Sequence, residues 1–457
     1  MKVSSISGPF GLHRPLTLLL AAALAAPLAG CAGGGPHLGH ARPHTTPTVG
    51  NRIPILSRVE AGAVEDKDIA SVAVVLPPAE ENADWAQPGG AANKSYGNLA
   101  LGAAPKLAWS KEVAGADGER RLAAAPVIGG GQLFIMDTAG VLHAMDAVTG
   151  AKHWTHSFEV PGRTAPAVFG GGASYSAGKV FITTGLGDVA AVDAKSGKVL
   201  WKIRPAGPLR GSPTIAFGSI FVMTQNNEIH ALNAEDGTEQ WQESASLGEE
   251  GVFGVAAPAA GQGTVIAGFS TGELIAYRYE NGRTLWSDAL SRTSLSASVG
   301  VLTDIDADPI IDHGRVYALG QGGRMAAYEL VTGQRIWELN LAGISTPAVA
   351  GDWIFTLTDE AKVLCIARST GKVRWVAQLD RFHDGKSKKD ALYWSGPVLA
   401  GDRLWLVNSE GGVYAVSAMD GTPKRFAKLG EKISLAPVVA GKTLFVITDK
   451  GKISAFR

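Results

Sequence analysis

Short apolar runs alternate with polar turn residues along most of the chain. From Pro126 onward the runs are rich in β-branched and aromatic residues, and glycine with aspartate or asparagine bounds them. Runs of this kind are typical of strands. The dipeptides Thr-Gly, Asp-Gly and Asn-Gly supply the positive φ that a tight hairpin needs. No stretch keeps the apolar period of a helix, so the pattern predicts an all-β fold.

The same arrangement of runs recurs eight times, and each copy starts near a proline. Successive prolines lie 40, 47, 45, 51, 38, 50 and 40 residues apart, at Pro126, Pro166, Pro213, Pro258, Pro309, Pro347, Pro397 and Pro437. A period of about 40–50 residues is typical of one four-stranded blade of a β-propeller. The eighth copy stops before its last strand, and residues 106–110 match the missing one. We therefore expect an eight-bladed β-propeller, closed by an N-terminal strand that pairs into the last blade.

Tryptophan follows the turn in most of these copies. Seven of the 11 tryptophans occupy this one repeat position, and Arg425 stands there in the seventh copy. The seven are Trp109, Trp154, Trp201, Trp241, Trp286, Trp337 and Trp375. A residue that recurs once per blade is expected to pack between blades, so we interpret these tryptophans as structural.

The N-terminus has the features of an export signal. Residues 1–30 begin with a polar, positively charged stretch and continue with an apolar one. The apolar stretch, residues 16–28, is shorter than the ~20 residues of a membrane span. It ends in Leu28-Ala29-Gly30-Cys31, which resembles a bacterial lipobox. That resemblance implies cleavage before Cys31, lipidation of Cys31, and an outer-membrane destination facing the periplasm, because Ala32 rather than aspartate follows. An ordinary signal peptide is the alternative.

Three segments follow from these patterns. Residues 1–30 are predicted to be the lipoprotein signal peptide and residues 105–457 the propeller. Between them, residues 31–104 are predicted to form a lipid-anchored tether and extended segment, since residues 32–50 are rich in Gly, Pro, Thr and His.

Charge and cysteine content exclude several classes of protein. The 42 Lys and Arg balance the 42 Asp and Glu, so there is no overall positive charge to favour nucleic acid. Two cysteines cannot form a disulfide-rich scaffold or a four-cysteine zinc site. With Cys31 lipidated, Cys365 is left alone in the mature chain.

The repeat carries a family resemblance. The pattern Ala-x-Asp-x-x-Thr-Gly-x-x-x-Trp, clear in residues 144–154 with a serine variant in residues 191–201, resembles the repeat of pyrroloquinoline-quinone-type propellers. The whole chain, with its lipobox, tether and eight blades, resembles the BamB family of outer-membrane lipoproteins. This resemblance implies a non-enzymatic scaffold of the β-barrel assembly complex. Its implied partners are the periplasmic POTRA domains of the barrel subunit, other members of the complex, and unfolded outer-membrane proteins.

A quinone-dependent dehydrogenase is the main alternative. Such enzymes, to judge by the same resemblance, hold a quinone, a Ca²⁺ ion and a catalytic aspartate, and many stack a disulfide of adjacent cysteines on the quinone. Cys365 has no neighbour that could form this disulfide. No nucleophile, metal-ligand or paired-carboxylate pattern recurs at a useful spacing. The sequence therefore predicts no catalytic residue, no cofactor and no metal; a general ligand-binding propeller stays open as a third interpretation.

Acidic residues alternate in the segment before the fifth copy. Asp304, Asp306 and Asp308 have the spacing that begins a calcium-binding loop. However, Pro309 stands where that loop needs glycine and Arg315 where it needs its final glutamate, which argues against calcium. The segment resembles the acidic loop with which the BamB family contacts its partner, and Asp304 and Asp306 are the matching acids. A solvated loop is the alternative for both.

The BamB family pairs that acidic loop with a loop that contains leucine and arginine, one blade earlier. In this register the chain has Val252 and Phe253, and no arginine. A second candidate, Leu209 with Arg210, matches the motif but lies one blade too early. The resemblance therefore leaves two loops as candidates for the part of the partner contact that the acidic loop does not make.

Overall fold

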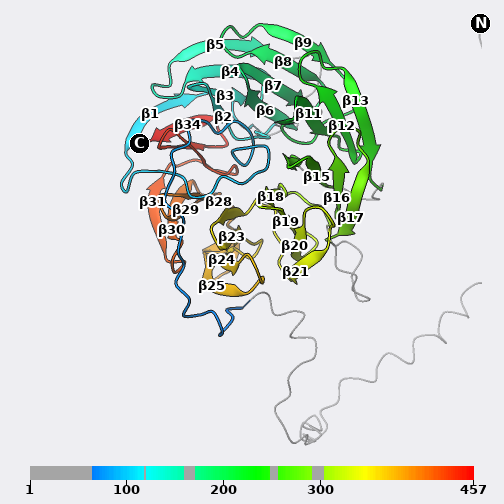
Figure 1. Cartoon of the computed structure of the whole chain (residues 1–457). Coiled ribbons are helices and arrows are strands. Elements are labelled where there is room, and N and C mark those ends of the chain that lie inside the picture. The colour runs from blue at the N-terminus through cyan, green and yellow to red at the C-terminus, as the bar shows by residue number, and fades with distance from the viewer. Residues whose placement is uncertain (1–63, 118–119, 159–169, 247–255, 291–302) are drawn as a thin grey trace, which may run out of the picture. The chain divides into compact units, whose positions relative to one another are not determined.

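The computed structural model describes residues 64–117, 120–158, 170–246, 256–290 and 303–457. Eight sheets of four antiparallel strands stand around a central channel as the blades of a propeller (Figure 1). The prediction of an eight-bladed, all-β propeller is confirmed. Among the described residues, no helix is long and apolar enough to cross a membrane.

Each blade runs from an inner strand at the channel, which has three residues in six of the eight blades, to an outer strand at the rim. The strands of blades 1 to 4 are β2 (Val127–Gly129), β3 (Gln132–Met136), β4 (Val141–Asp146), β5 (Lys152–Ser157); β6 (Gly171–Ser176), β7 (Lys179–Thr184), β8 (Val189–Asp193), β9 (Val199–Ile203); β10 (Thr214–Ala216), β11 (Ser219–Met223), β12 (Glu228–Asn233), β13 (Glu239–Ser244); and β14 (Ala259–Gly261), β15 (Thr264–Gly268), β16 (Glu273–Arg278), β17 (Thr284–Ala289).

The strands of blades 5 to 8 follow the same order, with one inserted hairpin. They are β18 (Ile310–Asp312), β19 (Arg315–Gly320), β20 (Arg324–Glu329), β21 (Arg335–Leu339); β22 (Ala348–Ala350), β23 (Trp353–Leu357), β24 (Lys362–Ala367), β25 (Val373–Gln378); β28 (Trp394–Ala400), β29 (Arg403–Asn408), β30 (Gly412–Ser417), β31 (Pro423–Lys428); and β32 (Val438–Ala440), β33 (Thr443–Ile447), β34 (Lys452–Phe456), with β1 (Leu107–Glu112). The hairpin, β26 (Phe382–Asp384) and β27 (Lys389–Ala391), accounts for the long proline spacing before blade 7.

The ring closes through strands from opposite ends of the chain. Strand β1 pairs antiparallel with β34, so that Trp109 lies opposite Ala455 and Glu112 opposite Lys452. The N-terminal strand thus becomes the outer strand of blade 8, as expected from the sequence. Closure in this way leaves only short strand edges, which protects a β protein from pairing with other chains.

The repeated tryptophans join neighbouring blades. Trp109, for example, donates its indole N–H to the carbonyl oxygen of Ala147 at 3.3 Å and lies against Gly150 in the turn of the next blade. A Cβ atom on Gly150 would come within 2.7 Å of the ring, and its φ of 70° also favours glycine. The other six tryptophans contact the corresponding turn glycines in the same way. Their predicted structural role between blades is confirmed.

Residues 64–104, which belong to the predicted tether and extended segment, pack on the ring. The backbone N–H of Asp66 bonds to the carbonyl of Val373 at the outer strand of blade 6. Further along, residues 82–99 cross the channel at the end where the inner strands finish, and we call them the plug. Figure 1 shows this segment in blue over the centre of the ring.

The plug takes up one hydrogen-bond donor from each of five successive blades. The donor is always the N–H of the penultimate residue of the inner strand, and the acceptor is a plug oxygen at 2.7–2.9 Å. The donor–acceptor pairs are Ile128 to Trp85, Tyr175 to Ala86, Ile215 to the Gln87 side chain, Ala260 to Ala92, and Ile311 to Asn93. Inner strands are sheet edges whose backbone groups need partners. The plug supplies them.

The channel therefore has two different ends. At the plugged mouth, the inner strands finish and the plug covers them. At the other end, the connections from the outer strand of one blade to the inner strand of the next come together; we call this end the loop mouth.

Candidate functional site

The acidic segment before blade 5 is extended, and its side chains alternate between core and channel. Ile305 and Ala307 are fully buried, and Ile305 packs on Gly268 of blade 4. The backbone N–H of Ile305 bonds to the carbonyl of Phe269 at 3.2 Å. Alternate residues of an extended chain point to opposite sides. The three acids, Asp304, Asp306 and Asp308, therefore lie together on the side away from the blade core.

Leu209 and Arg210 lie in the connection into blade 3. Leu209 is fully buried in the core between blades 2 and 3. The backbone of Arg210 is held on both sides, because its N–H bonds to Met223 and its carbonyl accepts from Gly171. This anchoring directs the guanidinium toward the loop mouth, where it meets the acids.

Arg210 binds two of the predicted acids directly. Its Nη2 lies 2.8 Å from Oδ1 of Asp304 and 3.3 Å from Oδ1 of Asp306. The side chains of Arg210 and Asp304 are 1% and 2% exposed, and that of Asp306 is 12% exposed. We call these three residues the Arg210 cluster. It links residues 94 positions apart in the sequence.

The structure thus brings together four of the predicted site residues, namely Leu209, Arg210, Asp304 and Asp306. It does so although Leu209 and Arg210 lie one blade earlier than the family motif predicts. The connections into blades 3 and 5 both line the loop mouth, and a long guanidinium side chain reaches from one to the other. Val252 and Phe253, in the connection between them, lie outside the described residues, as does Cys31.

Burial dominates the electrostatics of this mouth. It raises the pKa of the Asp306 carboxyl to about 6, and the neighbouring Asp304 adds to the shift, while Arg210 acts against both. Burial also raises the pKa of Asp308 and lowers the pKa of Lys94, in the plug, to about 8. Lys94 and Asp308 oppose each other's shifts without a direct ion pair.

Several atoms of the Arg210 cluster are buried without a partner. Within the described part of the chain, Nε and Nη1 of Arg210 and Oδ2 of Asp304 form no hydrogen bond. Buried polar groups are bonded in the large majority of cases, and each exception needs an explanation. The cluster therefore holds two loops together while leaving some of its own hydrogen-bonding capacity unused.

Two residues that shape this site, Lys94 and Asp308, were not singled out by sequence reasoning as a pair. Asp308 was noticed only as part of a calcium pattern that the sequence argued against. Lys94 stands in a stretch of Gly, Ala and Asn with no apolar pattern. No sequence signal indicated that its side chain is 1% exposed and bonds to the Thr214 hydroxyl at 3.2 Å.

Two further observations concern metal ligands and the free thiol in the regions that the structure describes. No three His, Cys, Asp or Glu side chains there group closely enough to hold a metal ion. Cys365 is fully buried in blade 6, and burial raises the pKa of its thiol.

Comparison with known proteins places this geometry in a family. A family model described as "Outer membrane protein assembly factor BamB" matches residues 99–171 and 167–377, a stretch that contains β1 and the whole Arg210 cluster. The chain belongs to the BamB family. The plug lies almost entirely before the matched stretch.

Relatives and solved structures agree with this membership. The BamB of Yersinia pestis is 26% identical over 357 residues, which cover 77% of this chain and 88% of that protein. The crystal structure of BamB from Moraxella catarrhalis is 19% identical, covers 77% of this chain and 99% of that one, and superposes with a TM-score of 0.63. Quinohemoprotein alcohol dehydrogenase from Comamonas testosteroni, at 14% identity, covers 86% of this chain and 82% of that one with a TM-score of 0.64. At such identities the two structures show the shared fold alone.

Proposed function

We propose that this chain is an assembly factor for outer-membrane proteins, as the names of its BamB relatives state for them, and that it acts by binding rather than by catalysis. The observation that carries this proposal is the family match across β1 and the blades up to blade 6. The quinoprotein alternative has only a likeness of fold in its favour, and folds host many functions.

The loop mouth is the proposed binding face for the POTRA domains of the barrel subunit. Loops on a rigid scaffold commonly carry binding residues, and this mouth holds all four described site candidates. Arg210, Leu209 and Asp304 are buried, so we assign them the task of fixing the shape of the two connections. Asp306 and the exposed residues around the mouth would then contact the partner.

A pair of matched substitutions tests this face. Ile344 is 49% exposed and lines the loop mouth, while Val331 is 74% exposed in a turn on the plugged side. We expect tagged full-length protein with Ile344→Arg to recover about tenfold less barrel subunit from mildly solubilised outer membranes, because a buried unpaired charge would oppose docking. Val331→Arg should recover the wild-type amount.

Two outcomes would contradict the proposal. Equal loss with both variants would remove the assignment to the loop mouth. Failure of the wild-type protein to recover the barrel subunit, together with quinone-dependent dye reduction in the presence of Ca²⁺, would favour the dehydrogenase instead.

The proposed anchor is the lipidated Cys31 at the outer membrane. Acyl chains contribute ~0.8 kcal/mol per buried CH₂ group, and two or more chains anchor a protein stably. Cys31→Ser should therefore move the protein from the outer-membrane fraction to the soluble periplasm, as measured by fractionation and immunoblotting. Continued membrane association of this variant would show that the anchor lies elsewhere.

A further inference from the structure

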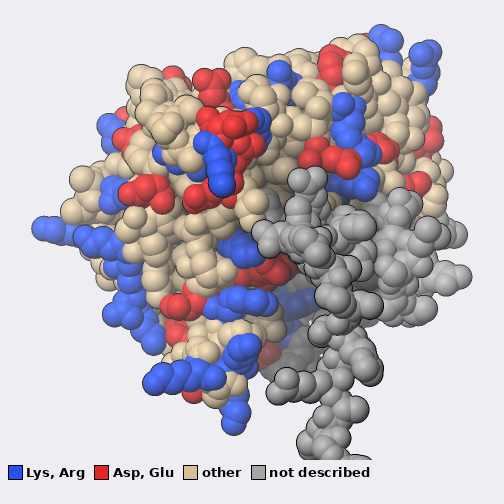
Figure 2. Space-filling model, turned by 90° about the horizontal axis from the view of Figure 1, so that it is seen from below, with Lys and Arg blue, Asp and Glu red and all other residues tan. Residues whose placement is uncertain are grey.

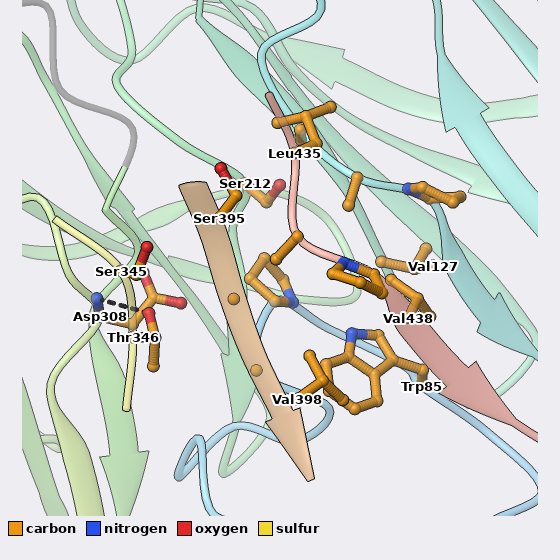
Figure 3. Close-up of a pocket in the computed structure, with 18 of the residues that line it drawn as sticks. Trp85, Val127, Ser212, Asp308, Ser345, Thr346, Ser395, Val398, Leu435 and Val438 are labelled. Atoms are coloured by element: carbon orange, nitrogen blue, oxygen red, sulfur yellow. Dashed lines mark hydrogen bonds between the residues drawn. The ribbon is translucent and has the colours of Figure 1, made fainter. Parts of the chain in front are cut away.

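A cup opens inside the channel above the plug. Its volume is about 260 Å³. Trp85 and Tyr96 of the plug form an aromatic floor, with ring centroids 5.0 Å apart. The walls come from residues at the starts of inner strands or just before them, and they include Asp306 and Asp308. Figure 3 shows Asp308 and Thr346 on the side of the cup opposite Trp85.

Two buried side chains of the cup each carry a polar group that has no hydrogen-bond partner among the described residues. Trp85 is 5% exposed and Ser212 is 4% exposed. Neither the indole N–H of Trp85 nor the hydroxyl of Ser212 forms a hydrogen bond with any described residue, although both side chains line the cup. The indole N–H can only donate, and the hydroxyl can do either. These groups are available to a ligand that carries an acceptor.

The two carboxylates of the wall are only partly satisfied. Asp308 accepts one bond, from the N–H of Ala257 to Oδ1 at 2.8 Å, and Asp306 accepts one, from Arg210 to Oδ1 at 3.3 Å. The second oxygen of each carboxylate has no hydrogen-bond partner in the described parts of the chain. Both carboxyl groups therefore have acceptor capacity left over.

The charges around the wall do not balance. Asp304 and Asp359 both add to the upward shift of the pKa of Asp306. Among the described residues, the opposing cations are Arg210, which is shared between two acids, and Lys94, whose Nζ bonds to the Thr214 hydroxyl. An additional cation would compensate the remaining negative charge.

The remaining lining is apolar and suits a hydrocarbon stem. Pro88, Pro126, Pro397 and Pro437 line the cup together with the two aromatic rings. Arg and Lys side chains bury their methylene groups along such surfaces and are attracted to aromatic faces. Pockets for drug-sized ligands usually measure about 300–1,000 Å³, so this cup is suited to one side chain rather than to a large cofactor.

We propose that the cup binds a single basic side chain, an alkylguanidinium or alkylammonium group, from the partner that docks on the loop mouth. The cation contacts Asp306 and Asp308, its stem lies over Trp85 and Tyr96, and the adjoining backbone carbonyl accepts from Trp85 or Ser212. This inference rests on the proposed function, because it takes the loop mouth to be the partner-binding face.

Fluorine NMR of the full-length protein labelled with 5-fluorotryptophan tests the site. The resonance of Trp85 is assigned from its absence in Trp85→Phe. N-acetylarginine amide should shift this resonance saturably, whereas the citrulline amide, which has nearly the same shape but no charge, should bind about tenfold more weakly, because bonds between charged groups are roughly twice as strong as neutral ones.

Three variants distinguish binding of the arginine amide in the cup from unspecific binding elsewhere on the protein. Asp308→Asn keeps an acceptor for Ala257 and should weaken arginine amide binding about tenfold. Ser345→Leu fills the cup from a half-buried lining position and should abolish the shift. Ser387→Leu, on the exposed hairpin between β26 and β27, is the matched control and should bind like the wild type. Circular dichroism confirms that each variant is folded.

Three results would overturn the inference: no saturable shift with the arginine amide, equal binding of the citrulline amide, or an unchanged shift in Ser345→Leu. Failure of the proposed function is distinguishable, because the barrel subunit would then be absent from the pull-down while the arginine amide still bound. If the barrel subunit is recovered and the arginine amide does not bind, only the cup assignment is lost.

Discussion

The two mouths of the channel differ in how far their polar groups are hydrogen-bonded. At the plugged mouth, five inner strands each donate a backbone N–H to the plug. At the loop mouth, Arg210 and Asp304 keep buried side-chain atoms without partners among the described residues. A polar site that is fully bonded stabilises a fold, whereas unmatched buried groups have a cost that a ligand can relieve. The comparison suggests that one end of the ring is structural and the other is for binding.

Arg210→Ala should affect stability most, since it removes the cation that binds the buried carboxylate of Asp304 directly. Breaking one partner of a buried ion pair costs about 3–5 kcal/mol of unfolding free energy, because the other charge is left uncompensated. Urea denaturation would measure this loss. Arg278→Ala is the control: its pair with Glu280 is exposed to solvent, where water screens the charges, so its loss should leave the urea midpoint nearly unchanged.

Replacing both partners sharpens the same comparison. Arg210→Met with Asp304→Leu removes the buried charges together and should regain most of the lost stability. A double variant as unstable as Arg210→Ala alone would mean that the side chains' packing, and not their charge, holds the two connections.

Asp306→Asn should change how stability depends on pH. Burial raises the folded-state pKa of Asp306 from its ordinary value of 3.8 to about 6, so the folded state binds the proton more strongly than the unfolded state. The free energy of unfolding therefore falls as pH rises from about 4 to about 6, by up to about 3 kcal/mol from this group. The variant should show a shallower fall when urea midpoints are compared at pH 4.5 and pH 7. An unchanged slope would contradict the raised pKa.

Gln87→Ala tests the plugged mouth and should have a smaller effect. The Gln87 amide bonds to both the N–H and the carbonyl of Ile215, each at 2.9 Å. Losing it leaves buried backbone groups unpaired, at a cost of about 1–3 kcal/mol. Hydrogen exchange should accelerate at the Ile215 amide and stay unchanged at Ile128, which bonds to the plug backbone. Acceleration at both amides would mean that the plug detaches as a unit.

The architecture could be predicted from the sequence because it repeats. Each copy starts near a proline, and most blades carry the turn glycine and the tryptophan, so eight copies of one local pattern leave little freedom in the fold. Even the closing strand was recognisable, since residues 106–110 carry the tryptophan that the eighth copy lacks.

The candidate site could be predicted only in part. The resemblance identified four site residues: Asp304, Asp306, Leu209 and Arg210. It did not predict the contact between Arg210 and the two acids. The motif was aligned by counting blades, and such a count does not show that an arginine side chain can reach from the connection into blade 3 to the connection into blade 5. The cup was invisible for a similar reason: Trp85 and Asp308 meet only because the plug returns to the ring.

The sequence by itself thus determined the strands, the number of blades and the closure of the ring, since these depend on local turns and on contacts between adjacent repeats. Only the tertiary structure decided which mouth the plug covers and which acids Arg210 neutralises. Those outcomes depend on pairs such as Lys94 with Thr214 and Arg210 with Asp304, whose members lie 120 and 94 residues apart. No local sequence pattern encodes such pairs. Once the fold has buried these side chains, burial shifts the pKa of the ionisable groups around them, such as Lys94 and Asp306.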